Sequence, residues 1–209
     1  MSPNLALFIL VILIVVGGFA LGTHRNVRRG DDAMRWAQGG LPLVGEKTTL
    51  HWLGSSVVQL KIQNAKRPFR DAEVLFVLEP RDIAPLWLLA RARGRRDLFI
   101  FRSRMHNLPG FEFEAFQPKA WSARGREAQL RNQKWRAVTV RGPLLAYAPE
   151  PPAAASQLLE LVTLSGCPLI RLSIQRNDPN FEVHWPLAEL QKLPASTVFE
   201  TLYKLGEQA

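Results

Sequence analysis

Six arginines form the densest group of residues that could do chemistry: Arg91, Arg93, Arg95, Arg96, Arg102 and Arg104, relieved locally by Asp97. A guanidinium group binds phosphate through two parallel hydrogen bonds. The pattern places these arginines at the end of a helix, in a turn and at the end of a strand, so several can converge. We predict an anionic-surface-binding site that takes phospholipid headgroups or nucleic acid. The alternative is a solvated surface, because a helix dipole alone favours basic residues near its carboxyl end.

The charge distribution favours lipid over nucleic acid. The chain has 209 residues and a formal net charge of +9, and the excess is uneven. Residues 24–149 hold 23 Lys/Arg against 11 Asp/Glu, whereas residues 150–209 hold 4 against 7. The acidic second part offers no matching basic stripe, and the sequence carries no helix–turn–helix, zinc-finger or RNP-type motif. A basic part directly behind a hydrophobic segment indicates anionic phospholipid headgroups as the partner.

Catalytic and metal-binding patterns are weak in this sequence. Glu112 and Glu114 share the polar face of one predicted strand, as acid–base partners would, but alternation gives any exposed strand such a face. The four histidines, including His184 on the outward face of a predicted strand, have no ligand-spaced partner. We predict that Cys167 is a buried structural thiol. With no phosphate-binding glycine loop or nucleophile elbow, we expect no cofactor, no catalytic residue and no metal site, and we disfavour an enzyme.

The amino-terminal segment predicts a membrane anchor. Residues 5–16 are apolar without interruption, the stretch extends to Gly22, and no charge precedes His24. A helix from Leu5 to Gly22 would span about 27 Å, close to the hydrocarbon thickness of a bilayer. The alternative is a cleaved signal peptide, with small residues around Gly22, but such a peptide normally begins with Lys or Arg. The basic residues instead follow the segment, at the membrane flank Arg25, Arg28 and Arg29.

The basic flank predicts the orientation of the span in the membrane. Basic residues next to a span stay on the cytoplasmic side. We therefore predict a single-pass protein of the cell membrane with its amino terminus outside and its soluble domain in the cytoplasm. An extracytoplasmic domain is the alternative.

The remaining sequence predicts an α+β fold, with antiparallel sheet and short helices, that follows one transmembrane helix. Apolar alternation and turn residues predict strands at 57–63, 74–78, 98–104, 111–115, 135–140, 144–148, 169–175 and 181–185, and helices at 83–93, 153–164 and 196–205. The division that follows is an anchor at 1–23, a basic collar and linker at 24–56, a first ββαββ half at 57–118, a basic connecting segment at 119–134, and at 135–209 a second ββαββ half with a C-terminal helix.

Two further expectations follow from this order of elements. The matching halves suggest a degenerate internal duplication, for which chance is the alternative. For function, we expect a non-enzymatic interaction or scaffold module at the membrane surface, which contacts the lipid bilayer and a protein partner. The alternatives are a membrane-tethered ligand-binding sensor or enzyme whose site forms only on folding, and an accessory subunit of a larger membrane complex.

Overall fold

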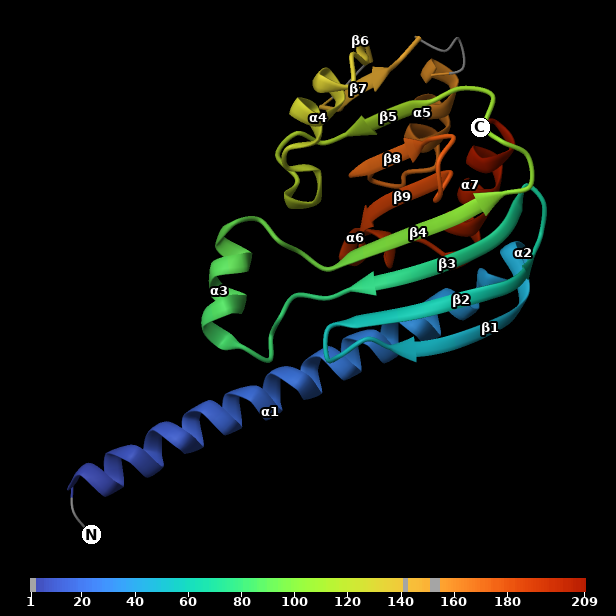
Figure 1. Cartoon of the computed structure of the whole chain (residues 1–209). Coiled ribbons are helices and arrows are strands. Elements are labelled where there is room, and N and C mark those ends of the chain that lie inside the picture. The colour runs from blue at the N-terminus through green and yellow to red at the C-terminus, as the bar shows by residue number, and fades with distance from the viewer. Residues whose placement is uncertain (1–2, 141–142, 151–154) are drawn as a thin grey trace.

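A single antiparallel sheet with helices against it follows a long amino-terminal helix (Figure 1). The computed structural model describes residues 3–140, 143–150 and 155–209. Its helices are α1 (Pro3–Gln38), α2 (Leu41–Val44), α3 (Ala84–Ala92), α4 (Arg126–Asn132), α5 (Ala155–Leu164), α6 (Leu187–Leu190) and α7 (Ala195–Glu207), with one 3-10 turn, η1 (Trp121–Ala123). The predicted α+β class is confirmed. The predicted start of the helix over 153–164 lies outside the described residues.

Within the part of the chain that the structure describes, the sheet has nine strands in the order β1-β2-β3-β4-β9-β8-β5-β7-β6, and every pair is antiparallel. Its strands are β1 (Gly45–Trp52), β2 (Val57–Ala65), β3 (Phe69–Val77), β4 (Leu98–Met105), β5 (Phe113–Phe116), β6 (Arg136–Val138), β7 (Leu145–Ala148), β8 (Arg171–Ile174) and β9 (Phe181–Pro186). The β4–β9 pair joins the two parts of the chain, because its partners are about 80 residues apart in sequence.

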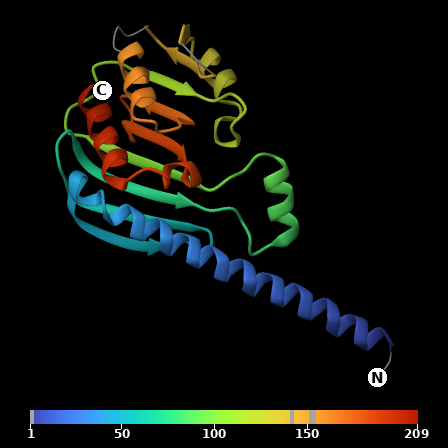
Figure 2. The ribbon, with the colours of Figure 1, turned by 180° about the vertical axis from the view of Figure 1, so that it is seen from behind.

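The two faces of the sheet differ. Seen from behind, α1, α5 and α7 lie over one face (Figure 2). That face holds the main core, with Phe69, Phe99, Phe181, Trp185 and Phe199 fully buried. The opposite face is covered at one end by the segment from η1 to α4, where Leu130 packs in a small apolar cluster. The other end of this open face carries polar and charged side chains.

The second half of α1 is an integral part of the folded domain. Its buried positions are all small or short, namely Gly22, Asn26, Gly30, Ala33 and Ala37, and they recur every three or four residues. This spacing lines them along one side of the helix. Small side chains allow the helix backbone to approach the sheet closely. A Cβ on Gly30 would overlap the Trp52 ring of β1, and one on Gly40 would overlap Phe199 of α7.

This packing corrects the prediction for residues 24–56. A collar and linker were expected there, but these residues contain the second half of α1, all of α2 and the edge strand β1. The helix was missed because glycine and alanine carry no apolar stripe. The strand was missed because its side chains alternate weakly, and six of its eight residues are exposed.

The internal duplication is not confirmed. In the first half β3 pairs directly with β4, whereas in the second half β5 lies between β7 and β8. The two central helices also differ, because α5 contributes four buried residues to the core while α3 contributes none of its described residues. The matching order of elements therefore does not extend to matching strand pairs.

Candidate functional site

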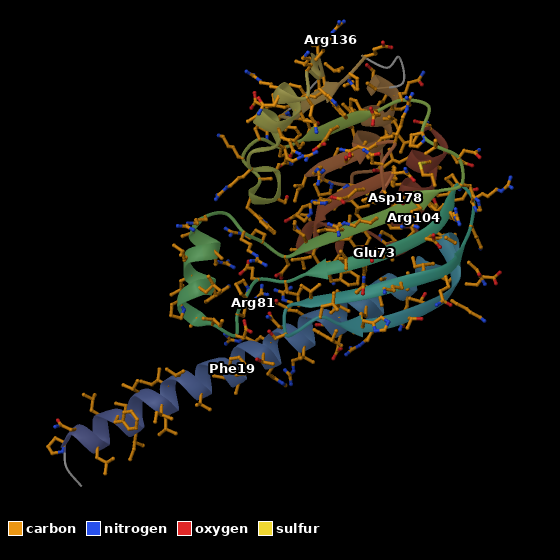
Figure 3. All side chains as sticks on the ribbon, viewed as in Figure 1. Phe19, Glu73, Arg81, Arg104, Arg136 and Asp178 are labelled. Atoms are coloured by element: carbon orange, nitrogen blue, oxygen red, sulfur yellow. The ribbon has the colours of Figure 1, made fainter. Side chains whose placement is uncertain are left out.

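The apolar segment of α1 ends at the point where the helix first contacts the domain. From Pro3 to Leu21 the helix has no buried residue among those described, and Gly22 is the first. A Cβ on Gly22 would overlap the backbone of Arg81 in the loop before α3. Figure 3 shows Arg81 beside α1, while Phe19 lies further along the free part of the helix. One helix is thus long and apolar enough to cross a membrane, with its apolar part outside the domain.

A buried polar clamp fixes α1 at this level. The Asn26 side chain donates to the Glu79 carbonyl oxygen at 3.1 Å, and Arg81 donates to the Asn26 side-chain oxygen at 3.1 Å. Arg81 also makes a two-pronged ion pair with Asp97, with both N–O distances 2.9 Å. The three side chains are mostly or fully buried. Because the polar groups of Asn26, Arg81 and Asp97 pair with one another or with the backbone, the clamp fastens α1 to the loop before α3.

Helix α3 projects from the domain and lies next to α1 (Figure 1). None of its nine residues, all of which the structure describes, is buried. Two side chains on one side of the helix attach it: Trp87 donates from Nε1 to the Glu79 carboxylate, and Arg91 contacts the same carboxylate at 3.3 Å. The Glu79 side chain is buried, so this pairing compensates its charge. The other sides of α3 face away from the protein.

Four of the six predicted arginines gather at the carboxyl end of α3. Arg93 is exposed, and Arg95 stacks over the Trp121 ring at 4.9 Å. Arg96 donates to the carbonyl oxygens of Arg91 and Arg95 at 2.9 and 2.7 Å. These contacts leave the guanidinium groups of Arg93 and Arg96 at the surface. We call Arg91, Arg93, Arg95 and Arg96 the α3 arginine group.

The other two predicted arginines lie elsewhere, on the open face of the sheet. Arg102 pairs with Glu182 at 2.8 Å, and Arg104 pairs with Asp178 at 3.0 Å (Figure 3). Both charges are already matched by carboxylates. The structure therefore divides the six arginines into two groups and does not bring them together in one site.

The flank arginines lie on exposed positions of α1. Arg25, Arg28 and Arg29 directly follow the apolar segment, and all three are exposed. The intervening buried residues Asn26 and Gly30 face the domain. Helix α3, whose carboxyl end carries the α3 arginine group, contacts α1 and lies beside it in Figure 1.

A network of buried charges on the sheet was not predicted from the sequence. Glu114 of β5 is fully buried and accepts hydrogen bonds from Arg126 of α4 and, at 2.9 Å, from Arg171 of β8. Arg171 also reaches Glu182 at 2.7 Å, so one guanidinium bridges two carboxylates. Glu112 lies outside this network and accepts from the Arg176 backbone. The paired strands bring together residues that are far apart in sequence, which single-strand patterns cannot show.

The prediction that His184 is exposed is wrong. The His184 side chain is buried, and its Nε2 lies 2.6 Å from Glu182. Burial alone would raise the pKa of Glu182, but the hydrogen bond with His184 and the charges of His184, Arg171 and Arg102 lower it to about 2. Burial lowers the pKa of His184 against the raising effect of the carboxylate. At neutral pH Glu182 is therefore ionised within its cluster of basic side chains.

These shifts predict loss of stability in acid. A carboxylate with a lowered folded pKa stabilises the fold above its unfolded pKa of 4.5 and loses this effect as the pH falls toward 2. For Glu182 this amounts to about 3 kcal/mol. The lowered pKa of His184 adds a smaller loss that begins below pH 6.5. Urea unfolding between pH 7.5 and 3 measures both, and Glu182→Gln should show a flatter dependence below pH 5. Identical pH profiles for the two proteins would contradict this assignment.

A polar groove of ≈ 850 Å³ lies on the same face, and its lining includes Lys61, Gln63, Glu73, Arg102, Arg104 and Asp178. Its lining balances the basic side chains of Lys61, Arg102 and Arg104 against the acidic side chains of Asp71, Glu73 and Asp178, and Arg104 pairs with Asp178. Such a lining offers no surplus charge to a phosphate.

The remaining sequence expectations concern metal and thiol chemistry. Across residues 3–140, 143–150 and 155–209, no three His, Cys, Asp or Glu side chains gather as a metal site would require. Cys167 is buried, as predicted, and burial raises the pKa of its thiol. Its environment is that of a structural thiol rather than a nucleophile.

No family model matches this chain, and no curated protein matches its sequence. We therefore infer its function from the structure of the chain alone.

Proposed function

We propose that this protein is a single-span membrane-anchored interaction module whose domain is held rigidly against anionic lipid. The observation that carries the proposal is the continuity of α1, which runs from Pro3 to Gln38 as one helix. Its apolar part projects from the domain, and its second part packs into the core. Because no flexible linker separates the two, the domain is held at a fixed distance from the bilayer.

The same continuity supports retention of the amino-terminal segment. Cleavage of a signal peptide near Gly22 would cut the helix at the residue that contacts Arg81. Since Gly22 is the first residue of α1 that is buried in the domain, such a cut would place the contact with Arg81 at a new chain end. We therefore assign the segment as an anchor.

The orientation that we propose places the domain in the cytoplasm. The exposed arginines of the flank follow the span directly, and the positive-inside rule assigns that side to the cytoplasm. The α3 arginine group lies on the same side of the span. Together they offer the anionic headgroups of the inner leaflet a basic surface, for which each Lys or Arg contributes about 1 kcal/mol.

Charge reversal tests the lipid contact. The fragment 22–209 keeps every buried residue of α1, so it suits a binding measurement on vesicles. We expect Arg93→Glu/Arg96→Glu to weaken its partition onto anionic vesicles by at least about tenfold, because two attractive charges become repulsive. Vesicle sedimentation or fluorescence titration measures this partition.

A matched pair of arginines provides the control. Arg131 and Arg136 are exposed on α4 and β6, and Figure 3 shows Arg136 at the end of the molecule away from α1. Reversal of both should change the net charge equally but leave the partition close to that of the parent fragment. If both double variants lose the same affinity, or if the parent binds neutral and anionic vesicles equally, the α3 arginine group has no specific role.

A membrane-tethered ligand-binding sensor is the second candidate, supported by the polar groove on the open face. The balance of basic and acidic side chains in the groove favours a neutral, hydrogen-bonding ligand over an anion. A small-molecule screen by thermal shift distinguishes the two functions. Stabilisation that Arg104→Ala abolishes would favour the sensor.

A further inference from the structure

We propose that α3 is a second membrane contact: an interfacial helix that lies in the headgroup region of the leaflet from which α1 emerges. The inference rests on the proposed function, because it requires α1 to span the bilayer. It adds that the domain touches the membrane at two points and is therefore held in one orientation.

Helix α3 and the residue before it expose large apolar side chains. Ile83, Leu86, Leu88 and Leu89 lie within seven consecutive positions and are 45–60% exposed. Four large aliphatic side chains on one short element form an exposed apolar patch, which in a soluble protein marks a contact surface. By helical spacing, Leu86 and Leu89 lie away from the side of α3 on which Trp87 and Arg91 attach the helix to the domain.

The position of α3 in the fold also favours a membrane contact. The loop that leads into α3 contacts α1 at Gly22, the residue at which the apolar segment ends. Figures 1 and 2 show α3 on the amino-terminal side of the domain, running across the direction of α1 rather than along it. With α1 upright in the bilayer, α3 lies near the plane of the interface.

The composition of α3 also favours a lipid contact. Leu86 and Leu89 share one side of the helix and arginines follow at its end, and helices of this kind bury their apolar side about 5–10 Å into the headgroup and acyl boundary. Arg93 and Arg96 are exposed where α3 ends, and guanidinium groups bind phosphate. A lipid bilayer would thus bury the exposed leucines of α3 and bind the arginines through its phosphate groups. We commit to the bilayer as the occupant of this surface.

Three single-cysteine positions test the inference in the full chain, in a Cys167→Ala background, reconstituted into neutral and anionic vesicles. Phe19→Cys reports insertion of α1, Leu88→Cys reports α3, and Leu108→Cys is an exposed control in the turn after β4. Each carries an environment-sensitive fluorophore, which is quenched by aqueous iodide or by lipid-attached spin labels. At position 88 we expect quenching by iodide about threefold weaker than at position 108, with strong quenching by shallow lipid labels.

The outcomes separate the two proposals. A protected position 19 with position 88 as open to iodide as position 108 would overturn the α3 contact and leave the anchor intact. An unprotected position 19 would overturn the anchor and the α3 contact together. Protection of position 88 in neutral vesicles as well, reduced by Leu86→Gln/Leu89→Gln, would support contact through the apolar face. Since both leucines are exposed, these substitutions leave the packing of the domain unchanged.

Discussion

Substitution of Glu114 by glutamine is expected to lower the free energy of unfolding by about 3–5 kcal/mol, the usual cost of breaking a buried ion pair. The Glu114 side chain is fully buried between Arg126 and Arg171, whose side chains are only 19% and 14% exposed. Glutamine keeps the shape but removes the charge that both guanidinium groups require. Urea denaturation of the fragment 22–209, followed by tryptophan fluorescence, measures the loss.

The control is the same chemical change at the surface. Glu127 pairs with Arg131 one helical turn away, and its side chain is 39% exposed. Such a pair contributes at most about 1 kcal/mol, so Glu127→Gln should leave stability nearly unchanged. Equal effects at both positions would show that the network around Glu114 contributes no more than a surface pair.

Substitution of Gly22 by leucine is expected to separate α1 from the loop before α3. The nearest atoms to the added side chain belong to the backbone of Arg81 and Asp82, which cannot rotate away as a side chain can. Overpacking costs about 1–3 kcal/mol where side chains can adjust, and we expect about 3 kcal/mol or more here. Thermal unfolding of the full chain in detergent measures the effect. Hydrogen exchange at the loop amides of Arg81 and Ile83 should rise in parallel.

Gly18 provides a matched control on the same helix. A Cβ at Gly18 meets no atom within 4 Å, so Gly18→Leu should leave the melting temperature and the exchange rates unchanged. The contrast between the two glycines isolates the docking contact from any general effect on the apolar segment. Equal behaviour of the two variants would mean that α1 does not dock at Gly22.

The sequence predicted those elements whose residues alternate or repeat locally. The strand over Val57–Ala65 buries alternate apolar side chains, the strand over Leu98–Met105 begins with a run of buried apolar residues, and helix α7 buries one apolar side, so all three were found near their observed positions. Strand β1 and the second half of α1 were missed. Both pack through features that hydrophobicity does not report, namely an exposed edge and a stripe of small residues.

The candidate site was only partly accessible to sequence reasoning for a related reason. The flank arginines and the α3 arginine group follow from local order, because each is defined by neighbours in the chain. The burial of Glu114 and His184 depends on strand pairs whose partners are about 13 to 84 positions apart in sequence. The position of β5 between β7 and β8 is not encoded in any single segment, so neither residue could be assigned a partner.

Retention of the amino-terminal segment as a membrane anchor underlies both proposals, and the mature amino terminus decides it. The full-length protein should be expressed in its native membrane, washed with alkaline carbonate, and its intact mass determined. We expect the protein to stay in the membrane pellet with a mass that includes the residues from Ser2 or Met1 onward. A chain that begins near Gly22 and is released by the wash would contradict the claim, and the proposed contact of α3 with lipid would fall with it.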